Sequence, residues 1–325
     1  MKIFLTGSLG FVGKHLARFL KNQGHDIISH VRTSHQNLFL DKNLNLSNVD
    51  LFDEKSLITE LQNIDVVIHC GAFVATWGKE EDFYRNNVLL TQSIIESAKK
   101  VGVQQLIYLS CASVVMNQPR ALLNISESLK STHIDGLPYS KSKGMAEQLV
   151  LDAGKDGLKT IALRPTFIWG LGDIVDRQIG KAAQAGKFGW FNQGDYLFST
   201  CYIENLNEAI TRALQSNQTG EAYFISDGQA ISYRSFMEKR LQISDYPIPS
   251  LSFPHWFAWA LAKFTENGWK YLPLKGSPPI TREMVRLTGY AFTVSIKKAS
   301  LHLAYQPKYS VTEALEHLSG LLPKP

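Results

Sequence analysis

The chain has 325 residues, 44% of them hydrophobic and 19% charged, which excludes a disordered chain and supplies ample apolar material for a large core. Its formal net charge of +5 is small and spread along the sequence, so we expect no nucleic-acid partner. The three cysteines lie far apart and form neither a disulfide framework nor a zinc spacing, so we expect a reducing compartment and no metal site.

Two further absences favour a soluble, cytoplasmic protein. No apolar run reaches the roughly 18 residues that a membrane span needs. The first strand pattern begins at Lys2, which leaves no room for a signal peptide before it.

Strand patterns and amphipathic helix patterns alternate along the first half of the sequence. The predicted strands are Lys2–Thr6, His25–Val31, Asp65–Cys70, Gln105–Ser110 and Thr160–Arg164, and the predicted helices are Gly13–Gln23, Leu57–Gln62, Phe83–Val101 and Tyr139–Ala153. This alternation indicates repeated strand–helix–strand units, which build a parallel sheet with helices on both faces. The expected fold class is therefore α/β, with a Rossmann-type doubly wound parallel sheet.

After Arg164-Pro165 the pattern becomes irregular and rich in Gly, Trp and Pro. Late sheet elements are expected near Tyr202–Leu214 and Glu221–Ser226, and a closing helical region at Leu301–Leu322. We therefore predict a nucleotide-binding domain at residues 1–168, completed by sheet elements near 200–226. A smaller, mostly C-terminal substrate-binding part would comprise residues 169–199 and 227–325.

A glycine-rich turn lies between the first strand and the first helix. Glycines there allow a tight turn and let the backbone approach a pyrophosphate, which the helix N-terminus then binds through free N–H groups. The residues that we expect to hold a dinucleotide in this turn are Gly7, Leu9, Gly10, Phe11, Val12 and Gly13.

The end of the second strand indicates which dinucleotide is bound. Chains that bind NAD usually have Asp or Glu there, whereas this chain has Val31 followed by Arg32-Thr33-Ser34. An arginine fork with neighbouring hydroxyls suits a 2′-phosphate, which an acidic residue would repel. We expect NADP(H) as the cofactor, bound through Arg32, with NAD(H) as the alternative.

Tyr139 and Lys143 are four residues apart in a predicted helix and therefore share one of its faces. A free tyrosine has a pKa of about 10, too high for easy proton exchange near neutrality. A nearby ammonium and the positive nicotinamide of an oxidised cofactor would stabilise the phenolate and lower that pKa. We expect Tyr139 to be the general acid/base and Lys143 to tune it.

These features resemble the extended short-chain dehydrogenase/reductase superfamily. The resemblance rests on the Gly-x-x-Gly-x-x-Gly spacing, on Asn87-Val88 with Thr91, on Tyr139-x-x-x-Lys143 and on Arg164-Pro165 before Gly170. It implies that Lys143 also bonds the nicotinamide ribose and that two chains pair through their long helices as a homodimer. Further cofactor contacts implied by the resemblance are Asp50, Leu51, Cys70, Gly71, Ala72, Asn87, Leu109, Ser110, Pro165, Thr166, Phe167 and Ile168.

One position departs from the superfamily's pattern. Where its members have a Ser or Thr that donates to the substrate oxygen, this chain has Cys111, and a thiol is a weak donor. Ser113 would share the side of Cys111 if the chain stays extended, whereas Ser110 would point the other way and Thr166 is a third candidate. The catalytic candidates beside Tyr139 and Lys143 are thus Cys111 and Ser113, and a cysteine nucleophile is the remaining alternative.

The segment Ala75-Thr76-Trp77-Gly78 and the segment Thr200–Asn205 are similar to the 3β-hydroxysteroid dehydrogenase branch, which includes sterol 4α-carboxylate dehydrogenases and 2-alkyl-3-oxoalkanoate reductases. This similarity implies a bulky apolar secondary alcohol or ketone as substrate. A nucleotide-sugar epimerase or dehydratase, or a non-catalytic cofactor-binding protein, are the alternatives. The aromatic stretch Phe253–Tyr271 is interpreted as a substrate lid, as a helix in peripheral contact with a membrane, or as a core helix.

Overall fold

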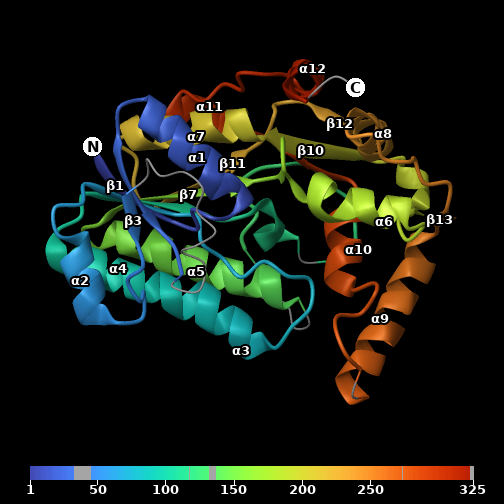
Figure 1. Ribbon diagram of the computed structural model, residues 1–325, viewed down its shortest axis with the longest axis horizontal. Coiled ribbons are helices and arrows are strands. Elements are labelled where there is room, and N and C mark those ends of the chain that lie inside the picture. The colour runs from blue at the N-terminus through green and yellow to red at the C-terminus, as the bar shows by residue number, and fades with distance from the viewer. Residues whose placement is uncertain (33–44, 117, 132–136, 273, 323–325) are drawn as a thin grey trace.

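A seven-stranded parallel sheet forms the centre of the molecule (Figure 1). The structure is a computed structural model that describes residues 1–32, 45–116, 118–131, 137–272 and 274–322. The strands lie in the order β11 (Glu221–Ile225), β7 (Lys159–Pro165), β5 (Gln105–Leu109), β4 (Val66–His69), β1 (Lys2–Thr6), β2 (Asp26–His30) and β3 (Asn45–Ser47). All neighbouring pairs are parallel, and the chain order reverses between β1 and β4, as in a doubly wound sheet.

Helices cover both faces of this sheet (Figure 1). One face carries α1 (Phe11–Asn22) and α7 (Ile203–Gln215), and the other carries α2 (Glu54–Leu61), α4 (Leu90–Val101) and α5 (Pro138–Lys155). Because successive side chains of a strand point to opposite faces, Ile3 and Leu5 pack with the first set and Phe4 with the second. The chain enters α4 without a break through α3 (Glu80–Phe83) and a π-helical turn at Tyr84–Leu89.

A second sheet and several helices make up the rest of the molecule. The second sheet contains β12 (Ala230–Ser232), β10 (Leu197–Tyr202), β14 (Phe292–Val294) and β6 (Leu122–Ile125), with β8 (Phe167–Trp169) paired to β10, and a separate pair joins β13 (Ser252–Phe253) to β9 (Trp190–Phe191). The accompanying helices are α6 (Gly180–Gln184), α8 (Tyr233–Ile243), α11 (Lys297–Leu303) and α12 (Val311–Leu321), with short helical turns at Ala112–Val115, Val175–Ile179 and Asn192–Gly194.

The helices α9 (His255–Tyr271) and α10 (Arg282–Thr288) pack against each other, and α9 projects from the lower right of the molecule in Figure 1. Along α9 the buried residues are Ala258, Ala262 and Glu266, which are spaced four apart and therefore form one narrow stripe. The rest of this long helix is half-buried or exposed.

The structure confirms the predicted α/β class and parallel sheet, but one expectation differs from it. Residues 203–215 form helix α7 rather than sheet, because Ile203, Leu206 and Ile210 recur at helical spacing and are buried against the sheet. The closing region predicted at Leu301–Leu322 is helical and consists of two helices, because Ala304 adopts a left-handed conformation, with φ 54°, that ends α11. The domain division at residue 168 remains a prediction.

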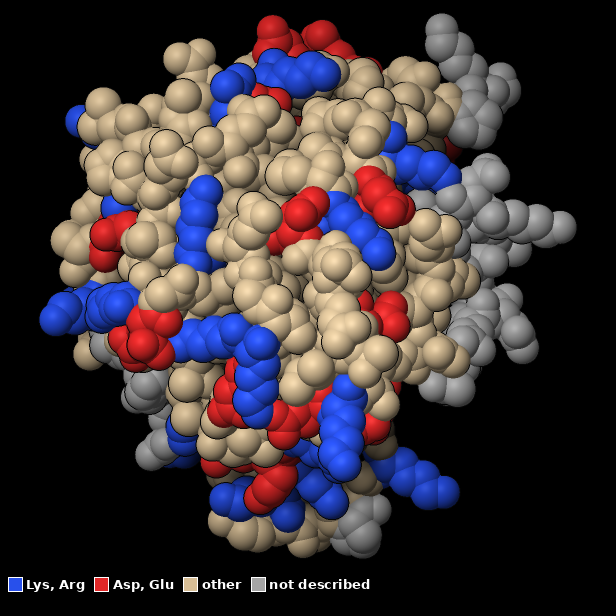
Figure 2. Space-filling model, turned by 90° about the vertical axis from the view of Figure 1, so that its left-hand side faces the viewer, with Lys and Arg blue, Asp and Glu red and all other residues tan. Residues whose placement is uncertain are grey.

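The charged side chains on the face shown in Figure 2 are mixed in sign. Several lysines are paired with carboxylates, as in Lys99 with Asp156 at 2.5 Å and Lys100 with Glu54. Interspersed charges of this kind agree with the small net charge. None of the helices in the described part of the chain is both long and apolar enough to cross a membrane.

Candidate active site

The turns after β1 and β4 are packed against each other at the carboxyl edge of the sheet. Gly7 has φ 75°, and a Cβ there would lie 2.7 Å from the backbone nitrogen of Gly71. A Cβ on Gly13 would lie 2.2 Å from the carbonyl oxygen of Gly7. Because no side chain tolerates such contacts, these glycines are required for the turn and for seating α1 close to β1. The predicted glycine turn therefore lies where the strand order reverses, the place where sheets of this kind bind ligands.

The first turn of α1 presents uncapped backbone N–H groups. Its N-cap is Gly10, no side chain caps it, and it contains no acidic residue. A Cβ on Gly10 would meet only the oxygen of Gly7, at 3.2 Å, so the turn is open on its outer side. Free N–H groups at the positive end of the helix dipole fit a pyrophosphate. Leu9, Phe11 and Val12 belong to the same turn.

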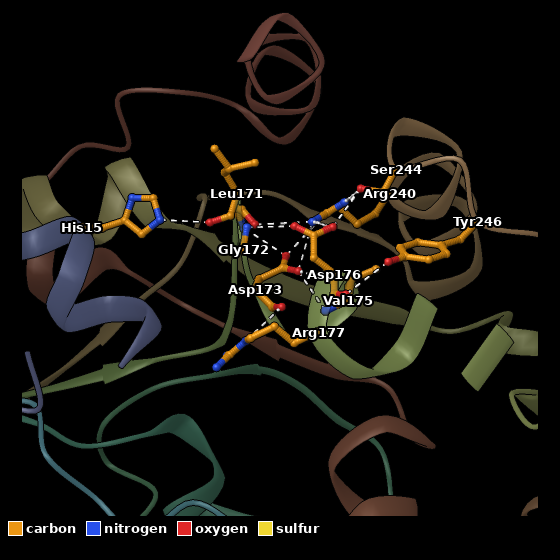
Figure 3. Close-up of polar contacts among 11 residues, drawn as sticks. His15, Leu171, Gly172, Asp173, Val175, Asp176, Arg177, Arg240, Ser244 and Tyr246 are labelled. Carbon is orange, nitrogen blue, oxygen red and sulfur yellow. Dashed lines mark hydrogen bonds and ion pairs between the residues drawn. The ribbon is translucent and has the colours of Figure 1, made fainter. Parts of the chain in front are cut away.

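Arg177 brings a positive charge to this turn, and sequence analysis gave it no role. Its guanidinium is exposed, and the guanidinium carbon lies 6.0 Å from the centre of the Phe11 ring. Figure 3 shows the loop that carries it, which the fully buried Arg240 of α8 fixes through ion pairs with Asp173 at 3.0 Å and Asp176 at 2.7 Å. A buried arginine paired twice makes this loop a firm support for Arg177.

Asn87 joins two parts of the site from within the π-helical turn. Its Oδ1 accepts a hydrogen bond from the backbone nitrogen of Phe73 at 2.7 Å, and its Nδ2 donates to Ser142 Oγ in α5 at 2.9 Å. The segment after β4, with Gly71 and Ala72, is thereby tied to α5. π-helical turns inside α-helices occur frequently at functional sites.

The segment after β5 brings the side chains of Cys111 and Ser113 next to Tyr139 of α5. The Sγ of Cys111 is 3.0 Å from Ser113 Oγ, and the thiol is also hydrogen-bonded to the side chain of Tyr139. The prediction placed Cys111 and Ser113 on one side of an extended chain. Instead, a 3₁₀ turn at Ala112–Val115 follows Cys111 directly, and the two side chains meet in this turn. Burial raises the pKa of the Cys111 thiol, which keeps it protonated and disfavours the nucleophile alternative.

Lys143 is buried one turn along α5 from Tyr139. Its Nζ donates to the carbonyl oxygen of Leu109 at 2.7 Å and lies 4.1 Å from the centre of the Tyr108 ring. Burial lowers the pKa of Lys143 to about 8, so its side chain is charged below that pH. An ammonium has three hydrogens, so donors remain for a ligand.

The pKa of Tyr139 is raised well above its usual value in the protein alone, whereas the predicted lowering includes the charge of an oxidised cofactor. Burial is the main cause, followed by the charges that Cys111 and Glu283 would carry. The expectation considered Lys143 and an oxidised cofactor, and it overlooked the buried acidic neighbours.

Ser140, Glu283 and Arg286 form a buried polar cluster behind Ser113 that sequence analysis missed. Ser140 Oγ lies 3.1 Å from Ser113 Oγ and donates to Glu283 Oε1 at 2.6 Å. Arg286 donates to Ser140 Oγ at 2.5 Å, pairs with Glu283 at 2.7 Å and bonds the carbonyl oxygen of Met116. The cluster therefore fixes the oxygen of Ser140 against Ser113 through helix α10.

Ser110 points away from this group, as predicted. Its Oγ donates to Glu147 Oε2 at 2.7 Å, and Arg164 donates to both oxygens of the same carboxylate at 2.9 and 2.7 Å. This buried ion pair joins α5 to β7 beneath the site. Thr166, the third hydroxyl candidate, is directed to β11, where its Oγ1 donates to the carbonyl oxygen of Ile225 at 3.5 Å.

The other predicted cofactor residues also follow the carboxyl ends of strands. Arg32 is exposed after β2, whereas Thr33 and Ser34 lie outside the described residues. Asp50 and Leu51 follow β3, with Asp50 Oδ1 accepting from the backbone nitrogen of Phe52 at 2.9 Å. Burial raises the pKa of Cys70, after β4, to about 12, although the charge of Lys143 opposes the rise. The remaining residues are Pro165 at the end of β7 and Phe167 and Ile168 in β8.

Comparison with known proteins agrees with this arrangement. The model of the 3-beta hydroxysteroid dehydrogenase/isomerase family matches residues 4–255. The 2-alkyl-3-oxoalkanoate reductase of Stenotrophomonas maltophilia is 29% identical over 98% of this chain and 99% of its own. The decarboxylating sterol-4-alpha-carboxylate 3-dehydrogenase of Dictyostelium discoideum is 27% identical over 97% of this chain and 99% of its own.

A solved structure shares the fold. The UDP-glucuronic acid 4-epimerase from Bacillus cereus in complex with NAD superposes with a TM-score of 0.73 at 22% identity, covering 98% of this chain and 96% of its own. This likeness concerns the fold alone, whereas the family model covers most of the sequence. The chain belongs to the 3-beta hydroxysteroid dehydrogenase/isomerase family and is an NAD(P)-dependent oxidoreductase of the extended short-chain type.

Proposed function

We propose that this protein interconverts a bulky apolar secondary alcohol and the corresponding ketone, with NADP(H) as the hydride carrier. The proposal rests on one observation. Tyr139 is hydrogen-bonded to Cys111, beside Ser113 and Lys143, at the carboxyl edge of the sheet where the glycine turn is open. Bound NADP(H) would supply the hydride to the carbonyl carbon or take it from the alcohol carbon. The residues of the chain handle the proton.

In the reduction, Tyr139 donates its phenolic proton to the carbonyl oxygen as that oxygen gains charge. Its raised pKa suits this role, because the hydroxyl stays protonated near neutral pH. In the reverse direction the phenolate accepts the proton of the alcohol, and the charge of Lys143, present below about pH 8, favours that phenolate.

Ser113 is the better donor of a second hydrogen bond to the substrate oxygen. A hydroxyl is a stronger donor than the thiol of Cys111. Ser140 and its partners also hold Ser113, which reduces the reorganisation that accompanies the reaction. Cys111 then serves as a neutral contact between Ser113 and Tyr139.

Two arginines are assigned different parts of the cofactor. Arg32, exposed after β2, would bind the 2′-phosphate that distinguishes NADP from NAD. Arg177, above the first turn of α1, would bind the pyrophosphate, which both cofactors share. Lys143 would use its remaining hydrogens on the nicotinamide ribose.

The apolar substrate class is supported by the relatives' names. One denotes a 3-oxo acid with an alkyl branch, and the other denotes a sterol acid with oxygen at carbon 3. We assign substrate binding to residues 169–199 and 227–325.

Titration with NADPH and NADH, followed by cofactor fluorescence, tests the cofactor assignment. We expect NADPH to bind more tightly. Arg32→Ala should remove only that preference, whereas Arg177→Ala should weaken both cofactors alike. Arg212→Ala is the matched control, because Arg212 is a half-exposed arginine that pairs with its helical neighbour Glu208. Preference for NADH in the unaltered protein would contradict the assignment to Arg32.

Turnover tests the reaction. Tyr139→Phe should abolish oxidation of NADPH by branched 3-oxo acids and sterol ketones while leaving NADPH affinity nearly intact, and unchanged turnover would refute the proposal. A cofactor that copurifies and is regenerated in each cycle would favour an epimerase. If Cys111→Ser showed no activity on any ketone and the unaltered protein were equally inert, a non-catalytic binding protein would be favoured.

We also retain two proposals about the protein's setting. Two chains would pair through the helices at 83–101 and 139–153, which light scattering tests as a doubled mass. A cytoplasmic location is supported by three cysteines that are all free in the structure.

A further inference from the structure

His69, the last residue of β4, is a buried titratable group that the proposed reaction does not use. Its side chain is 1% exposed and lies below the edge of the sheet that carries the candidate active site. Its Nδ1 is 2.6 Å from Thr6 Oγ1 of β1, and its Nε2 is 3.1 Å from Thr91 Oγ1 of α4. Each ring nitrogen therefore has a threonine hydroxyl from a different element as its partner.

The neighbours of the two threonines fix the direction of every hydrogen bond in this chain. The carbonyl oxygen of Asn87 can only accept, so the hydrogen of Thr91 Oγ1, 2.6 Å away, is used there. The backbone N–H of Gly71 can only donate, so Thr6 Oγ1 accepts it at 3.1 Å and directs its own hydrogen to His69 Nδ1. Consequently His69 Nε2 donates to Thr91, and the imidazole is the neutral tautomer with its hydrogen on Nε2.

The surroundings of His69 keep its ring neutral. Burial, together with the charges of Lys143 and His30, lowers the pKa of His69 to about 3. The ring of Tyr108 has its centre 5.5 Å from the centre of the imidazole and 4.1 Å from Lys143 Nζ. A protonated imidazole would donate from both nitrogens and leave the hydrogen of Thr6 Oγ1 without its acceptor. The chain of hydrogen bonds therefore requires the neutral ring.

Both ends of this chain belong to the candidate active site. Thr6 directly precedes the glycine turn, whose free N–H groups fit a pyrophosphate. At the other end, Asn87 Nδ2 donates to Ser142 Oγ at 2.9 Å, and Ser142 Oγ donates to the carbonyl oxygen of Tyr139 at 2.9 Å. His69 thus connects the glycine turn with the helix that carries Tyr139.

We propose that His69 is a positioning residue that couples the glycine turn to Tyr139. The inference rests on the proposed function, in which the cofactor has its pyrophosphate at the turn and its nicotinamide beside Tyr139. The imidazole holds β1, β4 and α4 at one spacing, and this spacing sets the nicotinamide against the ketone that Tyr139 protonates. His69 acts through Thr6 and Thr91 rather than by contact with the substrate.

Steady-state kinetics and titration with NADPH test this role. Thr91→Val cannot accept from His69, so kcat should fall about 10²-fold, as a misplacement of about 1 Å does, while KM for the ketone and Kd for NADPH change little. Thr91→Ser keeps the hydroxyl and should recover most of kcat. His69→Leu should lower kcat as far as Thr91→Val, and the double variant no further, because both changes break the same chain.

Thr160→Val is the matched control. Thr160 is fully buried near the start of β7, and its Oγ1 donates to the carbonyl oxygen of Val150 at 2.8 Å. This variant should lose about as much thermal stability as Thr91→Val but keep a normal kcat. A merely structural role of His69 would lower the stability of both variants and the kcat of neither.

Hydrogen exchange and NMR test the coupling without turnover. In the unaltered protein, NADPH should slow exchange of the backbone N–H of Phe73, which Asn87 Oδ1 holds at 2.7 Å. In Thr91→Val, NADPH should still bind but no longer slow that exchange. The ¹⁵N spectrum of the unaltered protein should show hydrogen on Nε2 of His69 and none on Nδ1.

Three outcomes would overturn the proposal. The first is a normal kcat in Thr91→Val, or a loss in Thr91→Ser as large as in Thr91→Val. The second is an effect of NADPH on the exchange of Phe73 that is equal in the unaltered protein and in Thr91→Val. The third is hydrogen on Nδ1 of His69. A protein that binds NADPH but reduces no ketone would refute the proposed reaction instead, and the exchange and NMR results would still decide the coupling.

Discussion

The neighbouring helices α9 and α10 place their side chains in opposite ways. α10 has seven residues and buries two charged ones, Glu283 and Arg286, beside the candidate active site. α9 has seventeen residues and exposes Trp256, Phe264 and Tyr271. Composition alone would assign the first helix to the surface and the second to the core.

The difference shows that the available interaction partners, rather than hydropathy, decide which side chains of these helices are buried. The charges of Glu283 and Arg286 neutralise each other and are bonded to Ser140, so their burial costs less than that of isolated charges. The exposed aromatic side chains of α9 have no such complement in the described chain, and they therefore remain at its surface.

Breaking the buried pair of α10 should have the largest effect on stability. Arg286→Met leaves Glu283 charged and unpaired in the interior, which should lower the free energy of unfolding by about 3–5 kcal/mol. Urea denaturation measures this loss. The control Arg212→Met, which removes a half-exposed pair with Glu208, should change it by less than about 1 kcal/mol. Equal effects would mean that the buried pair matters no more than a surface pair.

The role of Ser113 is tested by comparing it with its neighbour Cys111. Ser113→Ala should lower kcat about 10²–10³-fold, as removal of one oxyanion donor does. Cys111→Ala should have a much smaller effect, because a thiol donates weakly. Steady-state kinetics with a saturating ketone measures both, and a larger loss for Cys111→Ala would assign the donor to the thiol.

Glu283 should act on Tyr139 through its charge. Since this carboxylate raises the pKa of Tyr139, Glu283→Gln should lower that pKa. Alcohol oxidation needs the phenolate, so the acidic limb of its kcat/KM profile should move to lower pH. Glu238→Gln, at a half-exposed carboxylate paired with Arg234, is the control. A loss of rate without a shift of the profile would indicate a purely structural role.

The two faces of α9 should differ in their tolerance of substitution. Phe264→Ala removes a large exposed side chain and should change the free energy of unfolding by less than about 0.5 kcal/mol. Ala262→Leu adds atoms at a fully buried position and should cost about 1–3 kcal/mol. Thermal denaturation of the two variants compares them, and a costly Phe264→Ala would mean that the exposed side of α9 is packed.

Local patterns were sufficient to predict the sheet and the groups that lie near one another in sequence. The glycine turn depends on Gly7, Gly10 and Gly13, and the pair Tyr139 and Lys143 depends on one helical turn. Both are short-range features, and strand–helix alternation extends them to the fold.

Contacts between distant segments could not be predicted in this way. Ser140 meets Glu283 across 143 residues, and Arg286 reaches Met116 across 170. No periodicity relates such positions. Arg177 was missed for the same reason, because its place above Phe11 depends on how Arg240 fixes a distant loop.

The late position of α10 in the sequence has a consequence for synthesis. The seven strands of the central sheet and the pair Tyr139 and Lys143 are all synthesised by residue 225, whereas Glu283 and Arg286 follow more than fifty residues later. The central sheet is therefore able to fold while Ser140 still lacks its charged partners. Cofactor affinity should mature before catalytic competence in the growing chain, and the last helices complete an enzyme that already holds its nucleotide.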